Sequence, residues 1–466
     1  MSESPSGPMS SEQPAAEVAD LATPTEAGPP RLGFLGHVNL VFLTYVTSAA
    51  LTLGVAVLMA RALGPEGRGV YALFLLSASL TQAVLSLGLG VSAVYHLGKR
   101  AYPLSRIVAN SQQVMLASAV VSGLLVLLAW PIVGDALLDR GAPYWVFAFA
   151  VPLFLNYNIL TTVLQGTSRF LAMNAVILAQ PLVLLALLVG GAALGDVDTT
   201  AALLFWSGAT LAATLLALAL LGRPALRLSE LLRIDWPSLR GQVRFGAQGQ
   251  VGNLVQLLNY RLDQFIVLLF VSTAGVGIYA VSVTMSQSVW FIANAVAVVL
   301  LPRLTAADDA DAARTTPLVC RNTLLVSALA ALGLGAVSPW LVEALFGGDF
   351  GSALRPLLWL LPGTVALAGS KILTSYIFSR GRPLINSSIT IVALAVTLVA
   401  DLALIPPFGV TGAAAASSLA YGVHFALALV AYRRLSGGSI WEAVFVRGDD
   451  LRRYVEAARR LVPAQT

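Results

Sequence analysis

Long apolar runs follow one another along almost the whole chain from residue 39. A helix needs about 20 apolar residues to cross the hydrocarbon core of a bilayer, and this chain offers many such runs. The composition agrees, because 57% of the residues are hydrophobic and only 11% are charged, whereas soluble domains carry about 25% charged residues. The sequence therefore predicts an all-α polytopic membrane protein.

About twelve transmembrane helices are predicted, six on each side of a polar break. The first six are expected near 39–60, 70–92, 107–130, 144–164, 172–195 and 201–222. The second six are expected near 246–270, 275–301, 318–345, 356–379, 384–405 and 410–432. The predicted organisation is a disordered cytoplasmic tail (1–30), an N-terminal six-helix bundle (31–222), a cytoplasmic amphipathic linker (223–245), a C-terminal six-helix bundle (246–432) and a cytoplasmic amphipathic tail (433–466).

The orientation follows from the basic residues, because cytoplasmic loops of membrane proteins carry an excess of Lys and Arg. Alternate predicted loops are rich in them: Lys99, Arg100 and Arg106; Arg169; Arg223, Arg227, Arg233, Arg240 and Arg244; Arg303 and Arg314; Arg380 and Arg382; Arg433 and Arg434. Both termini are then expected in the cytoplasm. The loop after the first span breaks the pattern, since it holds Arg61 and Arg68 and faces outward.

The two sets of six spans resemble each other. The string GRGVYA at 67–72 recurs 208 residues later as GVGIYA at 275–280. Because six spans separate the copies, the halves are expected to be parallel repeats related by an axis along the membrane normal. The glycines are expected to allow a tight turn between helices, and Tyr71 and Tyr279 to lie at the headgroup level.

Two charges break this symmetry in the run NYRLDQFIVLLF at 259–270. The repeat aligns Arg261 and Asp263 with the apolar residues Leu53 and Val55, so the fold itself does not require the charges. A charge near the bilayer centre costs about 3 kcal/mol or more and usually faces a cavity. The sequence therefore favours at least one of them lining a lumen. The alternative is that Arg261 pairs with a carboxylate on a neighbouring helix.

Lys371 shows the same asymmetry, since it lies in the middle of an apolar run and aligns with Thr161. Two cations in one half suggest an anionic ligand. Arg61 and Arg68 are candidates to extend this cationic path at its outer mouth, although such side chains also reach out to lipid headgroups.

The strings ARALGPEGRGVYAL (60–73), YRLDQFIVLLFVSTAGVGIYAVS (260–282) and LLPRL (300–304) together resemble the Wzx-type polysaccharide and O-antigen flippases of the multidrug/oligosaccharidyl-lipid/polysaccharide exporter superfamily. The resemblance covers about 400 residues. It implies a V-shaped bundle of two six-helix halves that works by alternating access in the bacterial cytoplasmic membrane.

The implied substrate is an undecaprenyl-diphosphate-linked oligosaccharide, moved from the inner to the outer leaflet for cell-surface polysaccharide synthesis. The resemblance also implies coupling to a proton or sodium gradient, for which Asp263 is the candidate residue. Membrane lipid, and a polymerase or glycosyltransferases of the same pathway, are the expected partners.

Two other functions remain open. A drug exporter of the same superfamily would be expected to have an anionic lumen, against which Arg261 and Lys371 argue. A membrane glycosyltransferase or polymerase would need large outward loops with catalytic residues, and none of the predicted outward loops exceeds about 15 residues. Lipid II flippases transport a similar substrate but carry two helices more than are predicted here.

Few residues suggest chemistry of another kind. Cys320 is the single cysteine, so neither an intramolecular disulfide nor a multi-cysteine metal site is possible. The three histidines are scattered without ligand spacing. No basic face on a soluble domain suggests nucleic acid. We therefore expect no enzyme activity, cofactor, metal or nucleic-acid partner.

Overall fold

The computed structural model describes residues 34–138, 145–195, 197–223 and 227–446. The predicted N-terminal tail (1–30) lies outside these residues, as does most of the predicted C-terminal tail. The described chain is helical and contains no strand, which confirms the all-α fold class.

Thirteen α-helices and one 3-10 helix make up this part of the chain. The first half contains α1 (Phe34–Leu85), α2 (Leu89–Gly98), α3 (Leu104–Leu138), α4 (Trp145–Gly166), α5 (Phe170–Leu194), α6 (Thr199–Leu221) and α7 (Leu228–Leu231). The second half contains α8 (Trp236–Phe270), α9 (Thr273–Ala306), α10 (Asp309–Phe346), η3 (Gly348–Ala353), α11 (Leu354–Ser379), α12 (Pro383–Ser436) and α13 (Ile440–Val444).

Two of the helices are each made of two segments joined at a kink. Gly64 in α1 and Gly409 in α12 have positive φ angles of 64° and 59°, a conformation that glycine adopts without steric cost. Pro65 follows the first kink and is suited to begin a helix, because its missing N–H would have no partner there. The connection predicted between the first two spans is therefore shorter than expected, since Arg61 and Arg68 lie in the helical segments on either side of the kink at Gly64.

Within the described ranges, nine helices are long and apolar enough to cross a membrane, so the protein is a multi-pass membrane protein. With α1 and α12 each divided at its kink, each predicted span coincides with helix to within a few residues, except that 70–92 is interrupted at 86–88 between α1 and α2. The count of twelve crossings stays a prediction, because α8 is not among these nine helices.

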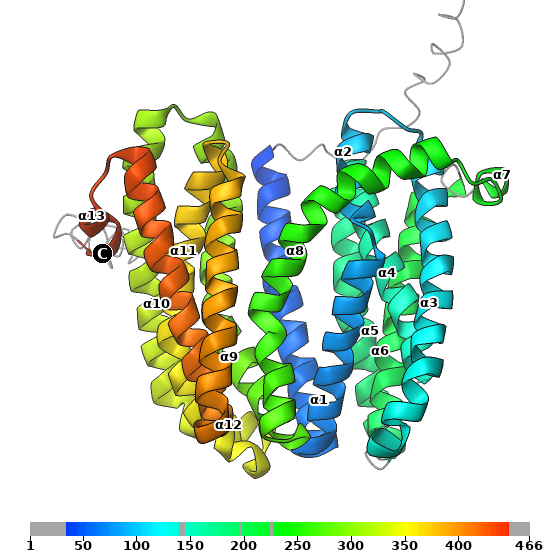
Figure 1. Ribbon diagram of the computed structural model, residues 1–466, viewed down its shortest axis with the longest axis horizontal. Coiled ribbons are helices and arrows are strands. Elements are labelled where there is room, and N and C mark those ends of the chain that lie inside the picture. Colours follow the sequence, from blue (N-terminus) through cyan, green and yellow to red (C-terminus); the bar gives the residue numbers. More distant parts are fainter. Residues whose placement is uncertain (1–33, 139–144, 196, 224–226, 447–466) are drawn as a thin grey trace, which may run out of the picture.

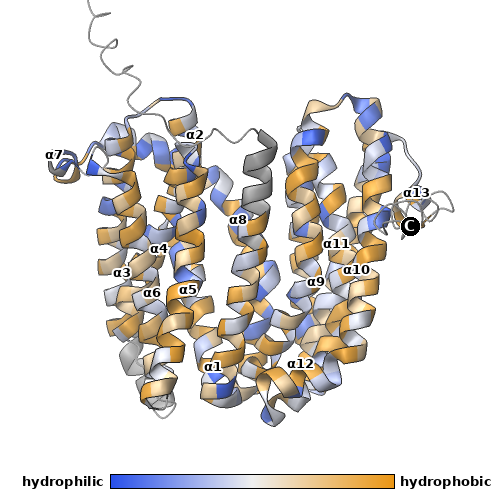
Figure 2. Cartoon of the chain, turned by 180° about the vertical axis from the view of Figure 1, so that it is seen from behind, coloured by the Kyte–Doolittle hydropathy of each residue, from blue (hydrophilic) through white to orange (hydrophobic). Residues whose placement is uncertain are grey.

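The helices form two groups that meet at one end and diverge toward the other (Figure 1). Helices α2–α6 make up one group and α9–α12 the other, with α1 and α8 between them. Hydrophobic residues run along most of the length of the helices, while hydrophilic residues gather at the diverging end and between the groups (Figure 2). The diverging end carries the Arg-rich turns after α2, α4, α9 and α11, which the charge rule assigns to the cytoplasm.

The repeated glycine motifs lie against each other at the closed end. A Cβ on Gly69 would overlap with the carbonyl oxygen of Thr273, and a Cβ on Gly277 would overlap with that of Pro65. These contacts are equivalent under the repeat, so the two halves meet there with twofold pseudo-symmetry. Backbones approach this closely only where residues are small. The glycines therefore serve a crossing of α1 and α9 rather than a turn.

Tyr71 and Tyr279 correct a second expectation from this motif. Both side chains are buried, at 3% and 0% exposure, so they contact protein rather than forming an exposed aromatic belt. Tyr279 binds the carboxylate of Asp263, so the second copy of the motif supports a polar site rather than a membrane interface.

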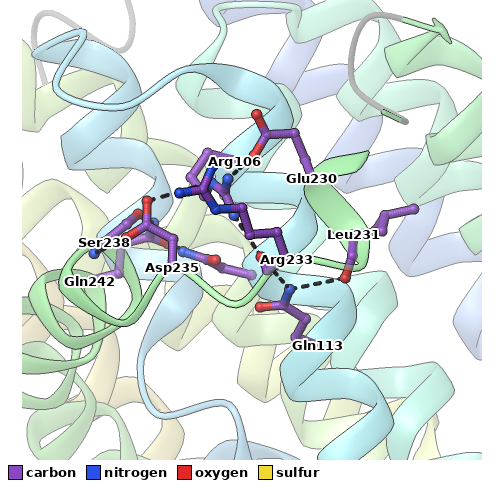
Figure 3. Close-up of polar contacts among 9 residues, drawn as sticks. Arg106, Gln113, Glu230, Leu231, Arg233, Asp235, Ser238 and Gln242 are labelled. Carbon is purple, nitrogen blue, oxygen red and sulfur yellow. Dashed lines mark hydrogen bonds and ion pairs between the residues drawn. The ribbon is translucent and has the colours of Figure 1, made fainter. Parts of the chain in front are cut away.

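The linker between the halves is docked onto α3 around the buried side chain of Arg106 (Figure 3). Arg106 forms ion pairs with Glu230 and with Asp235, the latter at 3.7 Å from Nε to Oδ2. It also donates to the carbonyl oxygen of Arg233 at 2.8 Å, and Gln113 donates to the same carbonyl. The linker is thus fixed to the first half and is not the single surface helix that its sequence suggests.

Helix α8 then passes from the first half to the second. Near its start, Phe245 stacks on Tyr95 of α2 with ring centroids 4.1 Å apart, and Gly246 packs against the backbone of Gly88. Further along, Asn259 accepts a 3.0 Å hydrogen bond from Thr397 of α12. The predicted domain boundary at residue 246 therefore falls inside a continuous helix that contacts both halves.

Substitution of Gly277 by alanine is expected to separate the halves at their closed end. The added methyl group has no room beside the Pro65 carbonyl, and overpacking of this kind costs about 1–3 kcal/mol. We expect a lower melting temperature in detergent. We also expect faster alkylation, from the outward side, of a cysteine introduced at Thr284 deeper between the halves.

Gly333→Ala in α10 is the matched control, because a Cβ there meets nothing within 4 Å. The native Cys320 is buried, so its background labelling is expected to be low. Equal melting temperatures and alkylation rates in the two variants would show that the glycine contact does not hold the halves together.

Candidate substrate-binding cavities

A cavity of about 400 Å³ lies between the two halves. Helices α1, α4, α5 and α6 line it from the first half, and α8 and α9 from the second. Arg68 and Arg261 both line this cavity and lie close enough for their like charges to repel each other. No carboxylate occurs among the described residues that line it.

Arg68 is almost fully buried, at 7% exposure, and its Nε atom has no hydrogen-bond partner in the described chain. Its guanidinium carbon lies 5.4 Å from the ring centroid of Tyr71, so the two side chains form a favourable but weak cation–π interaction. Arg68 is placed here because the second segment of α1 begins at Pro65 and turns this residue inward.

Arg261 is half-buried and lines the same cavity from α8. It makes no ion pair or hydrogen bond with any residue that the structure describes, so the structure shows no pair with a carboxylate on a neighbouring helix. Its charge does interact electrostatically with the carboxylate of Asp263, two residues further along α8. A buried charge without a counter-ion is unfavourable. The cavity between the halves is therefore suited to an anion that both arginines contact.

Arg61 lies elsewhere. Its Nε donates to the carbonyl oxygen of Leu345 at 2.8 Å, and a terminal nitrogen donates to that of Ala344. These carbonyls end α10, where a cation is favourable because the last carbonyl groups of a helix lack partners. Arg61 therefore connects α1 to α10 at the closed end and lines neither of the two cavities described here.

Lys371 lines a second and larger cavity of about 980 Å³, formed by α8, α9, α11 and α12 with one residue of α1. Its ammonium group donates to Asn294 and lies 3.9 Å from the ring centroid of Trp290. The structure thus separates Lys371 from the arginine pair, although sequence reasoning placed Lys371 and Arg261 in one lumen.

Asp263 is buried beside the cavities and lines neither of them. Its carboxylate accepts hydrogen bonds from the hydroxyl groups of Tyr279, at 2.5 Å, and Ser417, at 3.1 Å. The backbone N–H of Gln264 donates to its other oxygen at 2.8 Å. Helices α8, α9 and α12 therefore converge on this one side chain.

Asp401 is a second buried acid that sequence reasoning missed. It lies in α12 at 0% exposure, and neither carboxylate oxygen has a hydrogen-bond partner among the described residues. It interacts electrostatically with Asp263. The same signal that identified Asp263 was available, because Asp401 is the only charged residue in the apolar run 383–432.

Comparison with solved structures supports the fold. The chain is similar to the lipid II flippase MurJ in an inward closed conformation, with a TM-score of 0.66, 12% identity and coverage of 85% of this chain and 90% of that one. It is similar to an inward-facing multidrug transporter of the MATE family and MOP superfamily, with a TM-score of 0.65, 13% identity and coverage of 84% and 95%.

A third similar structure is the MATE multidrug transporter DinF-BH, with a TM-score of 0.62, 15% identity and coverage of 89% and 100%. These proteins are transporters and flippases rather than enzymes. At these identities the similarity shows the fold alone. No curated protein matches the sequence.

A family model described as "Polysaccharide biosynthesis protein" matches residues 58–355. The match begins in α1 before the kink at Gly64, includes both glycine motifs and the linker, and ends at the start of α11. It therefore contains both arginines of the smaller cavity as well as Asp263. The chain belongs to the polysaccharide biosynthesis protein family.

Proposed function

We propose that this protein is a flippase that moves an undecaprenyl-diphosphate-linked oligosaccharide from the inner to the outer leaflet of the bacterial cytoplasmic membrane. The observation that carries the proposal is the pair Arg68 and Arg261, which lines a cavity between the halves without a carboxylate to neutralise it. The family match to polysaccharide biosynthesis supports a substrate of this kind.

A diphosphate suits this pair. Guanidinium groups form paired, charge-assisted hydrogen bonds with phosphate oxygens, and these bonds strengthen where water is excluded. Arg68 comes from the first half and Arg261 from the second, so a bound diphosphate would connect the two halves. Binding could then be coupled to their relative movement, as alternating access requires.

The direction of loading follows from the shape. The halves diverge at the Arg-rich end (Figure 1), which the charge rule places in the cytoplasm. Lipid-linked precursors are assembled on that side in the proposed pathway, so this conformation is suited to accept substrate from the inner leaflet. A polymerase or glycosyltransferases of the same pathway are the proposed partners.

Asp263 is the proposed ion-coupling residue, together with Asp401. Two carboxylates that interact inside a membrane repel each other, so a proton or a cation bound between them stabilises the site. Tyr279 and Ser417 join Asp263 to α9 and α12, and Asp401 itself belongs to α12. Occupancy of the site by a cation could therefore change how three helices of the second half pack.

A drug exporter of the same superfamily is the second candidate, because two of the similar structures are multidrug transporters. A cationic drug requires carboxylates in the cavity that receives it. Asp263 and Asp401 line neither cavity, whereas three cations do. The cavities therefore favour an anionic substrate.

Replacement of Arg261 by glutamine is expected to stop transport while preserving the fold. Loss of charge-assisted hydrogen bonds of about 1.5–3 kcal/mol corresponds to a loss of affinity of roughly 10–100-fold. In cells that depend on this chain, we expect the lipid-linked precursor to accumulate in the inner leaflet and the surface polysaccharide to disappear, at matched protein levels.

Arg303→Gln is the control for this experiment, because Arg303 lies on the exposed surface of α9. It should leave surface polysaccharide unchanged. Normal polysaccharide in the Arg261→Gln strain would show that the arginine pair does not hold the substrate. The drug-exporter alternative predicts a different result, namely unchanged polysaccharide and greater drug sensitivity in cells without the protein.

Asp263→Asn tests the coupling role separately from binding. The amide keeps the size of the carboxyl group and can still accept from Tyr279, but it lacks the charge that attracts a cation. In proteoliposomes, we expect substrate binding to persist and the stimulation of transport by a proton or sodium gradient to be lost. Gradient stimulation equal to that of the wild type would contradict a coupling role for Asp263.

A further inference from the structure

The two cavities follow one another along a single face of α9. Thr284 and Gln287 line the smaller cavity, and Phe291, Asn294 and Val298 line the larger one. Their spacing of three and four residues places all five on one side of a helix. Because α9 runs toward the Arg-rich end, the larger cavity lies on the cytoplasmic side of the smaller one.

The residues of α8 show the same order of the two cavities along the helix. Leu257 and Arg261 line the smaller cavity, while Gln256 and Tyr260 line the larger cavity from neighbouring positions. Residues nearer the start of α8, such as Asn253, line only the larger cavity. A ligand held at Arg261 could therefore extend past Tyr260 into the larger space.

Several side chains in the lining of this larger cavity are able to form hydrogen bonds with hydroxyl groups. Amide side chains include Gln248, Asn253, Gln256 and Asn386. Each amide presents a donor and an acceptor, which matches neighbouring sugar hydroxyls that also donate and accept. The Nδ2 atom of Asn386 donates to the carbonyl oxygen of Thr374 at 2.9 Å, which fixes this side chain in the lining.

Lys371 gives this lining one positive charge. Asn294 and the face of Trp290 hold its ammonium group in place, and neither carries a negative charge. No Asp or Glu lines the cavity within the ranges that the structure describes. The lining is thus mostly apolar, but it carries several amide side chains and one positive charge that an acidic ligand group would neutralise.

We infer that the larger cavity is the subsite for the glycan, and that Lys371 pairs with an acidic group on one of its sugars, a carboxylate or a phosphate. This inference rests on the proposed function and adds that the diphosphate and the sugars of the substrate bind in different cavities. The diphosphate occupies the 400 Å³ cavity at Arg68 and Arg261, and the sugars occupy the 980 Å³ cavity.

The volumes agree with this division. Ligand pockets that bury a drug-sized molecule measure about 300–1,000 Å³. The smaller cavity lies near the lower limit and suits a compact group such as a diphosphate. The larger one lies near the upper limit and can hold several sugar residues.

The test measures binding of three ligands to the purified full-length protein in lipid nanodiscs. The ligands are sugar-free polyprenyl diphosphate, the same lipid with a neutral oligosaccharide, and the same lipid with one sugar replaced by a uronic acid. For Lys371→Met we expect about tenfold or more loss of affinity for the acidic ligand alone. Lys371→Arg should retain the preference for the acidic ligand.

Lys99→Met is the matched control, because Lys99 is the only other lysine of the chain and is exposed. Asn386→Leu provides a second variant that leaves the charge intact. It should weaken binding of both sugar-bearing ligands and leave binding of the sugar-free lipid unchanged.

Each contrary result has a distinct meaning. If Lys371→Met lowered the binding affinity for all three ligands equally, Lys371 would be assigned to the diphosphate. That result would overturn the glycan subsite, while the proposed function would stand. If Lys371→Met weakened binding of the neutral and the acidic glycolipid equally and left the sugar-free lipid unchanged, the pairing of Lys371 with an acidic sugar group would be overturned. If the wild-type protein binds none of the three lipids, the proposed function itself fails.

Discussion

Backbone contact between α1 and α9 at Gly69 and Gly277 holds the two groups of helices together at their closed end. The rest of the arrangement depends on this contact. Because the halves meet there, they can diverge toward the Arg-rich end and leave two cavities along α9. A larger residue at either glycine would separate the backbones, and the closed end would no longer exclude water from the cavities.

The charges within the helical region are stabilised in different ways, and the differences indicate what each one does. Arg61 binds the last carbonyl groups of α10, and Asp263 binds two hydroxyl groups. These contacts are complete within the protein. Arg68 and Arg261 make no direct ion pair with a described residue, and only Arg261 interacts electrostatically with the carboxylate of Asp263, so a ligand in the cavity can supply the partner that both arginines lack. Unpaired cations in a cavity are stronger support for a binding site than their presence in the sequence alone.

The sequence predicted the helical class, the multi-pass membrane character and the relation between the halves, because a membrane imposes long apolar runs and the repeat is visible in the glycine motifs. It also identified Arg261 and Asp263, since a charge in an apolar run is conspicuous. It did not predict that Tyr279 would bind Asp263 or that Lys371 would lie apart from Arg261. Those facts depend on how α8, α9 and α11 pack, which no local pattern encodes.

The repeat also explains why the charged residues lie where they do. Symmetric positions such as Gly69 and Gly277 form the contact between halves, where twofold pseudo-symmetry lets two equivalent surfaces fit. Arg261, Asp263 and Lys371 align with apolar or uncharged positions in the first half. A substrate with a charged head and an extended glycan has no such symmetry. The second half can therefore carry the groups that recognise it, because changes there leave the symmetric contact intact.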